Sequence, residues 1–297
     1  MSINLDLHGV VRVSISDRVH RNVKESIARQ LALLDVSPES ASIPESPGPA
    51  ELRVEPLEDI SLSDRRWVGG PAALHGKQVL EFPGQELVAI FEEDRITLHL
   101  GVTGVPINPW LQFLLVPKGI TMVHAAAVER DGNVLLLPAF GGAGKTLSIG
   151  LLVRDHGYKF LGDDIVLLHE DGRVLSFPRP LFFYDHHLDV FEQFFSRRGN
   201  AIARYRLLGP VKRRIVRGFP FKPFFKSIVR SIGLEGPVRR AAATREYIDA
   251  ARPQEVFPAE SLGDIGKLER VAFLQRYDGK DLLWVDCDVR TLERRVF

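Results

Sequence analysis

One stretch near the middle of the chain combines glycine, lysine and threonine in an order that suits phosphate binding. It runs through Ala139, Phe140, Gly141, Gly142, Ala143, Gly144, Lys145 and Thr146. In the pattern G-x-x-x-x-G-K-[ST], backbone N–H groups surround phosphate oxygens, the lysine reaches the β- and γ-phosphates, and the hydroxyl binds Mg²⁺. Only the first glycine is replaced, by Ala139, and alanine is tolerated there if its φ is negative. The segment predicts a site for ATP or another nucleoside triphosphate with Mg²⁺.

Two adjacent carboxylates follow this loop. Asp163 and Asp164 begin 18 residues after Lys145, which leaves room for one helix and a strand that returns to the ligand-binding edge of a sheet. One carboxylate can hold Mg²⁺ and the other can accept the proton of an attacking hydroxyl. Neighbours on an extended chain face opposite ways, so we expect separate roles, with Thr146 and Asp164 as the metal ligands. Which aspartate is the base stays open, and a solvated turn is the competing interpretation.

An Asp-Gly pair at residues 131–132 predicts a tight hairpin. A two-residue turn pairs Arg130 with Asn133, and counting back places His124 opposite Ala139. His124 would then lie beside the phosphates, where a histidine can donate a hydrogen bond or neutralise charge. A core histidine with a backbone partner is the alternative.

A second Asp-Gly pair lies at residues 171–172. The same count pairs Glu170 with Arg173 and places Arg179 opposite Asp164. We expect Arg179 to orient this aspartate or to contact the nucleotide. A surface ion pair is the alternative.

The elements that would position these residues begin near residue 117. We predict strands over 124–128 and 134–137, a helix over 145–156 that ends at Gly157, and strands over 158–161, 165–168, 174–177, 270–274 and 282–285. Residues 1–115 are predicted to form an α+β accessory domain, and residues 116–297 the domain with the phosphate loop. The accessory domain has a predicted helix over 21–34 and strands over 10–16, 50–54, 78–82, 87–91 and 95–100.

Residues 117 to 182 resemble the HPr kinase/phosphorylase superfamily, especially HPr-kinase-like serine kinases outside the sugar-transport system. The resemblance rests on HAAAV at 124–128, GGAGKT at 141–146 and GYKFLGDD at 157–164. It implies a curved mixed sheet like that of phosphoenolpyruvate carboxykinase, and a site of His124, Lys145, Thr146, Asp163 and Asp164. Gly141 replaces the family's usual serine, and the signature linked to phosphorylase activity is not recognised. HPr itself is therefore not the expected substrate.

These observations predict an α/β (α+β overall) chain with a P-loop kinase core. We expect an ATP- and Mg²⁺-dependent kinase that transfers the γ-phosphoryl group to a hydroxyl of a protein or peptide serine, of free serine or of a sugar. The alternative is a regulatory module that binds nucleotide without transferring phosphate. Candidate nucleotide-binding residues are Gly141, Gly142, Ala143, Gly144, Lys145, Thr146 and Arg179, and candidate catalytic residues are His124, Lys145, Asp163 and Asp164.

Charge and composition limit the partners. The chain has 297 residues and a net charge of +1, which argues against a general nucleic-acid binder. Residues 190–252 nevertheless hold 15 Lys or Arg against 4 acids, and their stretch 212–230 interleaves cations with phenylalanine. An acidic protein partner, an amphipathic helix at a membrane surface and a solvated face are the alternatives there. The single Cys287 and the lack of an apolar leader or spanning segment predict a cytoplasmic protein, and a homo-oligomer stays open.

Overall fold

The structure is a computed structural model that describes residues 3–31, 49–57, 62, 65–70, 72–177, 179–198 and 249–275. The chain divides into two compact units, of which the second, Leu181–Val256, interrupts the first in sequence. The first unit comprises Met1–Pro180 and Phe257–Phe297. The predicted boundary between residues 115 and 116 lies inside this first unit, at the end of a helix, and the predicted division stays a prediction.

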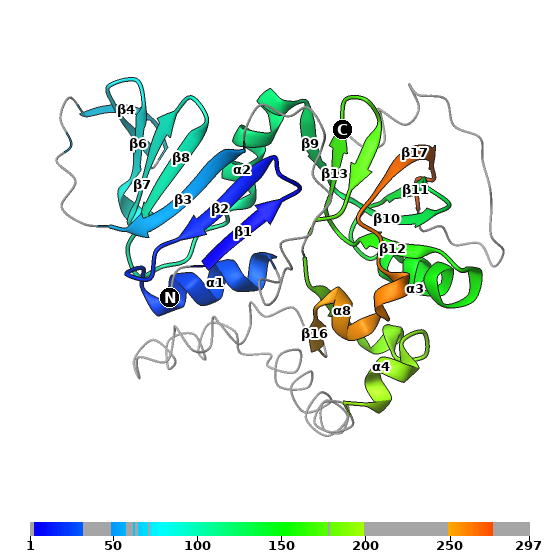
Figure 1. Ribbon diagram of the computed structural model, residues 1–297. Helices are drawn as coiled ribbons and strands as arrows, with labels where there is room; N and C mark the ends of the chain where they lie inside the picture. Colours follow the sequence, from blue (N-terminus) through cyan, green and yellow to red (C-terminus); the bar gives the residue numbers. More distant parts are fainter. Residues whose placement is uncertain are drawn as a thin grey trace. The chain divides into compact units, whose positions relative to one another are not determined.

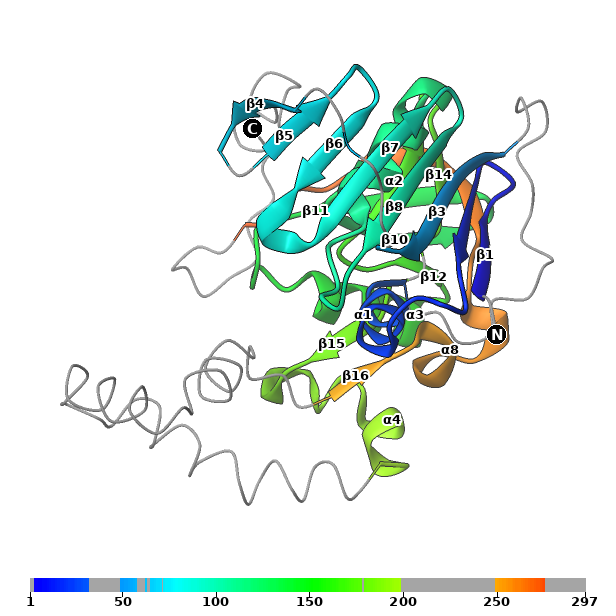
Figure 2. The same ribbon diagram turned by 90° about the vertical axis from the view of Figure 1, so that its left-hand side faces the viewer.

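An eight-stranded mixed sheet opens the first unit. Its strand order is β1-β2-β3-β8-β7-β6-β5-β4, with parallel pairs at β2–β3 and β3–β8. Figure 2 shows most of these strands side by side. Alternate residues of β2 are buried, as expected for a sheet with one covered face. The strands are β1 (Ile3–Leu7), β2 (Val11–Ile15), β3 (Ala50–Pro56), β4 (Arg65–Gly69), β5 (Ala72–His75), β6 (Val79–Phe82), β7 (Leu87–Glu92) and β8 (Arg95–Leu100).

Two helices pack against buried side chains of the first unit. Helix α1 (Arg21–Leu31) buries Val23, Ile27 and Leu31 at helical spacing, and the last three residues of the predicted helix lie outside the described residues. Helix α2 (Asn108–Leu115), which was not predicted, has proline near its start and buries four apolar residues. One buried cluster contains side chains of α2, of this sheet and of the second sheet, so the two sheets share a hydrophobic core.

The second sheet is a curled mixed sheet of seven strands, which carries the candidate site. Its order is β12-β10-β11-β17-β14-β13-β9, and β11–β17 is its one parallel pair among the strands described. Figure 1 shows helix α3 (Lys145–His156) beside β10 and β12. The strands are β9 (Ile120–Val123), β10 (Ala125–Arg130), β11 (Asn133–Pro138), β12 (Lys159–Gly162), β13 (Val166–His169), β14 (Arg173–Leu175) and β17 (Ile265–Val271). The structure is mixed α/β with few helices and a curved mixed sheet, as predicted, while the P-loop kinase core stays a prediction.

The hairpin of β10 and β11 has the predicted register. Arg130 pairs with Asn133 across a two-residue turn, in which Asp131 has φ 55° and Gly132 has φ 81°. Positive φ at both positions matches the strand twist of a tight hairpin. The pairing ends at Ala125, so His124 lies just outside the ladder.

The register predicted for the second hairpin is wrong by one residue. Leu168 pairs with Val174, so the connection of β13 to β14 is longer than the two residues predicted. Only Gly172 has a positive φ, because the Asp171 carboxylate accepts the Arg173 N–H at 2.9 Å and contacts the His169 ring at 2.8 Å. This local bonding favours a turn closed from Gly172 N–H to His169 O, at 2.8 Å, over the tighter turn.

The C-terminal strand begins five residues before the prediction. Strand β17 covers Ile265–Val271, whereas residues 270–274 had been predicted from their apolar run. Three polar residues, Lys267, Glu269 and Arg270, interrupt the apolar pattern of this strand and are exposed, so the sequence does not reveal it. Beyond it, Leu274 still bridges to Ala139 at the start of the phosphate loop. The strand predicted over 282–285 lies outside the described residues.

The second unit is described at its two ends only. Strands β15 (Leu181–Phe183) and β16 (Asp249–Ala251) pair antiparallel, and Phe183 packs against Phe191, Phe194 and Phe195. Arg198 joins the ends through ion pairs to Asp249 and Glu255, at 2.8 and 2.7 Å. The unit also contains helices α4 (Glu192–Ser196), α8 (Pro253–Val256) and η3 (Asp185–His187).

The predicted partner surface at residues 212–230 lies outside the described residues, as does Cys287. Within the described ranges, no helix has the length and apolar character needed to cross a membrane. The other short helices of the first unit are η1 (Pro83–Gln85), η2 (Val116–Lys118) and η4 (Ala259–Ser261).

We expect Gly266→Ala to destabilise the chain by about 1–3 kcal/mol, because the added methyl would overpack the second sheet. A Cβ at Gly266 would lie 2.7 Å from Val134 Cγ2 and 3.1 Å from the Gly132 carbonyl oxygen. Gly84→Ala is the matched control, since a Cβ there meets no atom within 4 Å. Urea unfolding of both variants measures the effect, and equal midpoints would contradict this packing.

Candidate active site

The phosphate loop connects β11 to α3 and borders open space. Gly142 has φ 81° and Gly144 has φ 100°, so both positions need glycine. A methyl group added at Gly141, Gly142 or Gly144 would meet no atom within 4 Å. The φ of Ala139 is not positive, which explains why alanine fits at the first position. The loop can therefore receive a ligand against its backbone.

The backbone N–H groups of the loop are available to an anion. Within the loop, Ala143 donates to the Phe140 carbonyl oxygen at 3.3 Å. Across the ranges that the structure describes, no group accepts the N–H of Gly142 or of residues 144–147. Unpaired N–H groups at a helix N-terminus, together with the helix dipole, favour phosphate. Together with the open space, these donors fit a polyphosphate.

Lys145 holds its ammonium between the loop and β10. Only 8% of the residue is exposed. Its Nζ donates to the Ala139 carbonyl oxygen at 2.7 Å and lies 3.2 Å from His124 Nε2. Burial lowers the pKa of Lys145, while the charges of Asp163 and Asp164 oppose that shift. The two ends of the loop are thus held together by one cation.

Thr146 contacts Asp163, whereas we had expected Asp164 beside it. The Thr146 hydroxyl donates to Asp163 Oδ2 at 2.7 Å. Asp163 is 8% exposed, and burial raises its pKa; the nearby charge of Asp164 raises it further, while the Thr146 hydrogen bond and Lys145 oppose the shift. A hydroxyl and a carboxylate oxygen side by side form part of a typical magnesium site.

Asp164 points in another direction and contacts the side chains of His124 and Arg179. Its Oδ1 lies 2.9 Å from His124 Nε2, and its Oδ2 lies 3.1 Å from Arg179 Nη2. Its side chain is 43% exposed, whereas Asp163 is buried. The two adjacent carboxylates therefore occupy different environments, as the sequence predicts.

A tight turn around Asp164 separates the two carboxylates. The Ile165 N–H donates to the Asp163 carbonyl oxygen at 2.9 Å, and Asp164 has φ 71°. A three-residue turn with positive φ is rare and strained. Strain of this kind occurs mainly where the surrounding structure enforces it, often at functional sites.

Arg179 reaches Asp164 although the register that predicted this contact is wrong. Arg179 follows β14, and its N–H donates to the Phe177 carbonyl oxygen at 2.8 Å. Its Nε is buried and has no hydrogen-bond partner in the described parts of the chain. The guanidinium thus keeps donor capacity next to the aspartate.

The site offers only a few protein ligands for a metal, which suits an ion such as Mg²⁺ that takes its other ligands from phosphate and water. No group of three or more His, Cys, Asp or Glu residues that could hold a metal occurs within the described ranges. Protein sites for Mg²⁺ usually supply one or two carboxylates, with phosphate and water as further ligands. Thr146 and Asp163 match that donor set, so these residues would hold the ion.

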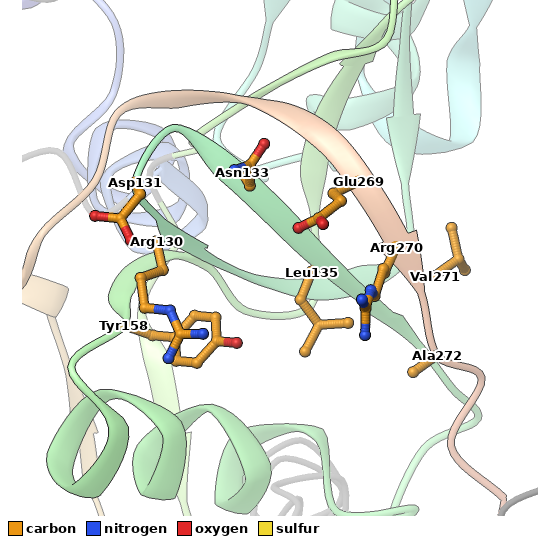
Figure 3. A pocket seen from close by; sticks show the side chains of 9 residues that line it. All are labelled: Arg130, Asp131, Asn133, Leu135, Tyr158, Glu269, Arg270, Val271 and Ala272. Carbon is orange, nitrogen blue, oxygen red and sulfur yellow. The ribbon is translucent and has the colours of Figure 1, made fainter.

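A second feature, which the sequence does not predict, is a pocket of about 580 Å³ on the α3 side of the second sheet (Figure 3). None of the candidate site residues lines it. No motif could reveal it, because β10, β11 and β17 bring residues from distant parts of the chain together. It is lined by Arg130, Asp131, Asn133, Leu135, Tyr158, Glu269, Arg270, Val271 and Ala272.

Similarity to known proteins does not identify the chain. Neither the models of known protein families nor the curated proteins contain a match to it. The function must therefore be inferred from the geometry of the chain's own residues.

We expect Asp163→Asn to stabilise the chain at neutral pH. Because burial raises the folded pKa above 3.8, the ionised carboxylate costs stability as pH rises through 3.8 to the folded pKa. Asparagine removes this cost and can still accept the Thr146 hydroxyl. The stability difference should be small below pH 3.8 and should grow to a plateau at higher pH, measured by urea unfolding across a pH series.

Asp155→Asn is the control for this effect. Its exposed carboxylate has a pKa lowered by the hydrogen bond from Arg154, so the substitution should shift stability in the opposite direction. A variant Asp163→Asn that is less stable than the original chain at neutral pH would show that burial does not dominate at this residue.

Proposed function

We propose that the chain is an ATP- and Mg²⁺-dependent kinase, similar to HPr-kinase-like serine kinases, that phosphorylates a hydroxyl group. The observation that carries the proposal is one connected set of contacts. Lys145, His124, Asp164 and Arg179 form a continuous chain of polar contacts. A second contact lies beside this chain: Thr146, which follows Lys145, donates a hydrogen bond to Asp163, which precedes Asp164. Such sets act mainly by positioning and by stabilising charge.

Phosphate binding would use the loop backbone and Lys145. The N–H groups of Gly142 and residues 144–147 are free to donate to phosphate oxygens. Lys145 has three donors, so an incoming phosphate could replace the Ala139 carbonyl as its partner. The buried position of Lys145 would strengthen that attraction, because little solvent screens it.

Thr146 and Asp163 would hold Mg²⁺, which when bound neutralises charge on the phosphates. Their contact at 2.7 Å keeps the hydroxyl and carboxylate oxygens adjacent. Asp163 carries this role better than Asp164, since Thr146 is its direct partner.

Asp164 would be the base. Its carboxylate is accessible, and His124 and Arg179 each fix one of its oxygens. The acceptor hydroxyl would attack the γ-phosphorus, its proton would pass to Asp164, and ADP would leave. A positioned base contributes roughly 10²–10⁴ in rate. The acceptor classes are those named above: a protein or peptide serine, free serine or a sugar.

A nucleotide-binding module without phosphate transfer is the second candidate. One observation favours it: both oxygens of Asp164 already contact a nitrogen of His124 or Arg179, so fewer lone pairs are left for a hydroxyl proton. In that case the loop would bind nucleotide and the chain would yield no phosphorylated product.

We expect Asp164→Asn to reduce phosphate transfer by roughly 10²–10⁴ while ATP affinity changes little, because the base acts only on the acceptor. Lys145→Ala should instead weaken ATP binding. The measurements are ATP titration and incubation of γ-labelled ATP with cell extract and a metabolite pool, with mass spectrometry of the labelled product.

Asp155→Asn and Lys159→Ala are the matched controls, since both residues are exposed and lie outside the candidate site. ATP binding without any labelled product would select the binding module. Binding and turnover unchanged in Lys145→Ala and Asp164→Asn would rule out both candidates.

A further inference from the structure

The pocket on the second sheet is separate from the phosphate loop. It has a volume of about 580 Å³, within the range of small-molecule sites. Tyr158 lines it just after α3 ends, whereas the phosphate loop precedes the start of α3 at Lys145. A helix of 12 residues is roughly 18 Å long, so the two features lie toward opposite ends of α3.

Strand pairing sets the chemistry of the pocket. Arg130 pairs with Asn133 on β10 and β11, and Leu135 pairs with Arg270 on β17. Side chains alternate along a strand, so Asn133 and Leu135 share a face, and their partners lie on that face too. Figure 3 shows Arg130 and Arg270 on either side of Leu135. Two cations therefore flank an apolar centre.

Arg130 is oriented by Tyr158. The guanidinium lies over the tyrosine ring, 4.5 Å from its centroid. This contact places the ring against one side of the cation, and the guanidinium N–H groups that do not face the ring can still donate to a ligand. A guanidinium edge binds carboxylate or phosphate with two parallel hydrogen bonds. The Arg130 wall of the pocket thus suits an anionic group.

The opposite wall offers charges of both signs. Glu269 and Arg270 are adjacent on β17, and the pairing with β11 skips Glu269. In Figure 3 Glu269 points toward the middle of the pocket, whereas Asp131 points away from it. In the described parts of the chain, none of these charged side chains has an ion-pair partner. The pocket therefore presents two cations and one carboxylate that a ligand can pair.

We propose that this pocket binds an acidic amino acid. Such a molecule has two anionic groups, one ammonium group and a short apolar stem, which complement the lining. Arg270 and Glu269 receive the α-carboxylate and the α-ammonium, Leu135 contacts the stem, and Arg130 binds the distal anion. Glutamate, aspartate and O-phosphoserine share this chemistry. The site does not depend on the proposed kinase activity.

Calorimetric titration of the full chain tests the ligand class. Glutamate, aspartate and O-phosphoserine are each titrated, and at least one should bind. Two analogues of glutamate serve as comparisons: glutamine, which lacks the distal anion, and glutarate, which lacks the ammonium group. Each lost charged hydrogen bond should weaken binding roughly 10- to 100-fold. Which of the three acids binds most tightly identifies the distal group as carboxylate or phosphate.

Variants tie the binding to this pocket. Arg130→Gln and Arg270→Gln should each lower the affinity for the bound acid roughly 10- to 100-fold. Glu269→Gln should weaken the binding of the acidic amino acid but should leave the binding of the analogue without an ammonium group unchanged. Lys159→Gln is the matched control, because it removes an exposed cation of neighbouring β12 that does not line the pocket. The proposal is overturned if none of the three acids binds, or if they bind Arg270→Gln as tightly as the original chain.

Discussion

Burial of the Lys145 ammonium is the constraint on which the candidate site depends. A buried cation is costly unless polar groups compensate it, and here the Ala139 carbonyl oxygen accepts its hydrogen bond while Asp163 and Asp164 lie near with opposite charge. Ala139 begins the loop and Lys145 ends it, so their contact fixes the curvature of the main chain between them. The glycine conformations at Gly142 and Gly144 then turn N–H groups toward open space. The candidate phosphate site is thereby shaped by contacts within the loop itself.

The same principle separates the two aspartates. Asp163 is held inside by the Thr146 hydroxyl, and Asp164 is held outside by His124 and Arg179. The strained turn at Asp164 makes this possible within two residues. Identical side chains acquire different acid–base properties from their surroundings, which is the usual way in which proteins divide chemical roles between carboxylates.

Local chemistry made part of the structure predictable from sequence. Helix α3 begins at Lys145 and ends before Gly157, as predicted from the loop and from the glycine cap, and the turn at residues 131–132 follows from Asp-Gly. The contact between Asp164 and Arg179 was also predicted, although from an incorrect register, whereas the contact between Asp164 and His124 was not predicted.

Features set by competing side chains or by distant pairing were not predictable. The Asp171 carboxylate contacts Arg173 and His169 next to it, and these contacts favour a longer turn in the second hairpin. Counting residue pairs back from an assumed two-residue turn does not take such contacts into account. The partner of Thr146 depends on a rare turn at Asp164 that residue preferences do not indicate. Strand β17 and the pocket depend on pairing with β11 across more than a hundred residues.

The position of β17 has a consequence for how the chain is made. This strand lies between β11 and β14, yet it leaves the ribosome only after the whole second unit has been synthesised. Until then the edge of β11 exposes unpaired N–H and C=O groups, which is the kind of surface that nascent chains pair incorrectly. The inserted unit thus sets a delay between synthesis of the phosphate loop and closure of the sheet that supports it.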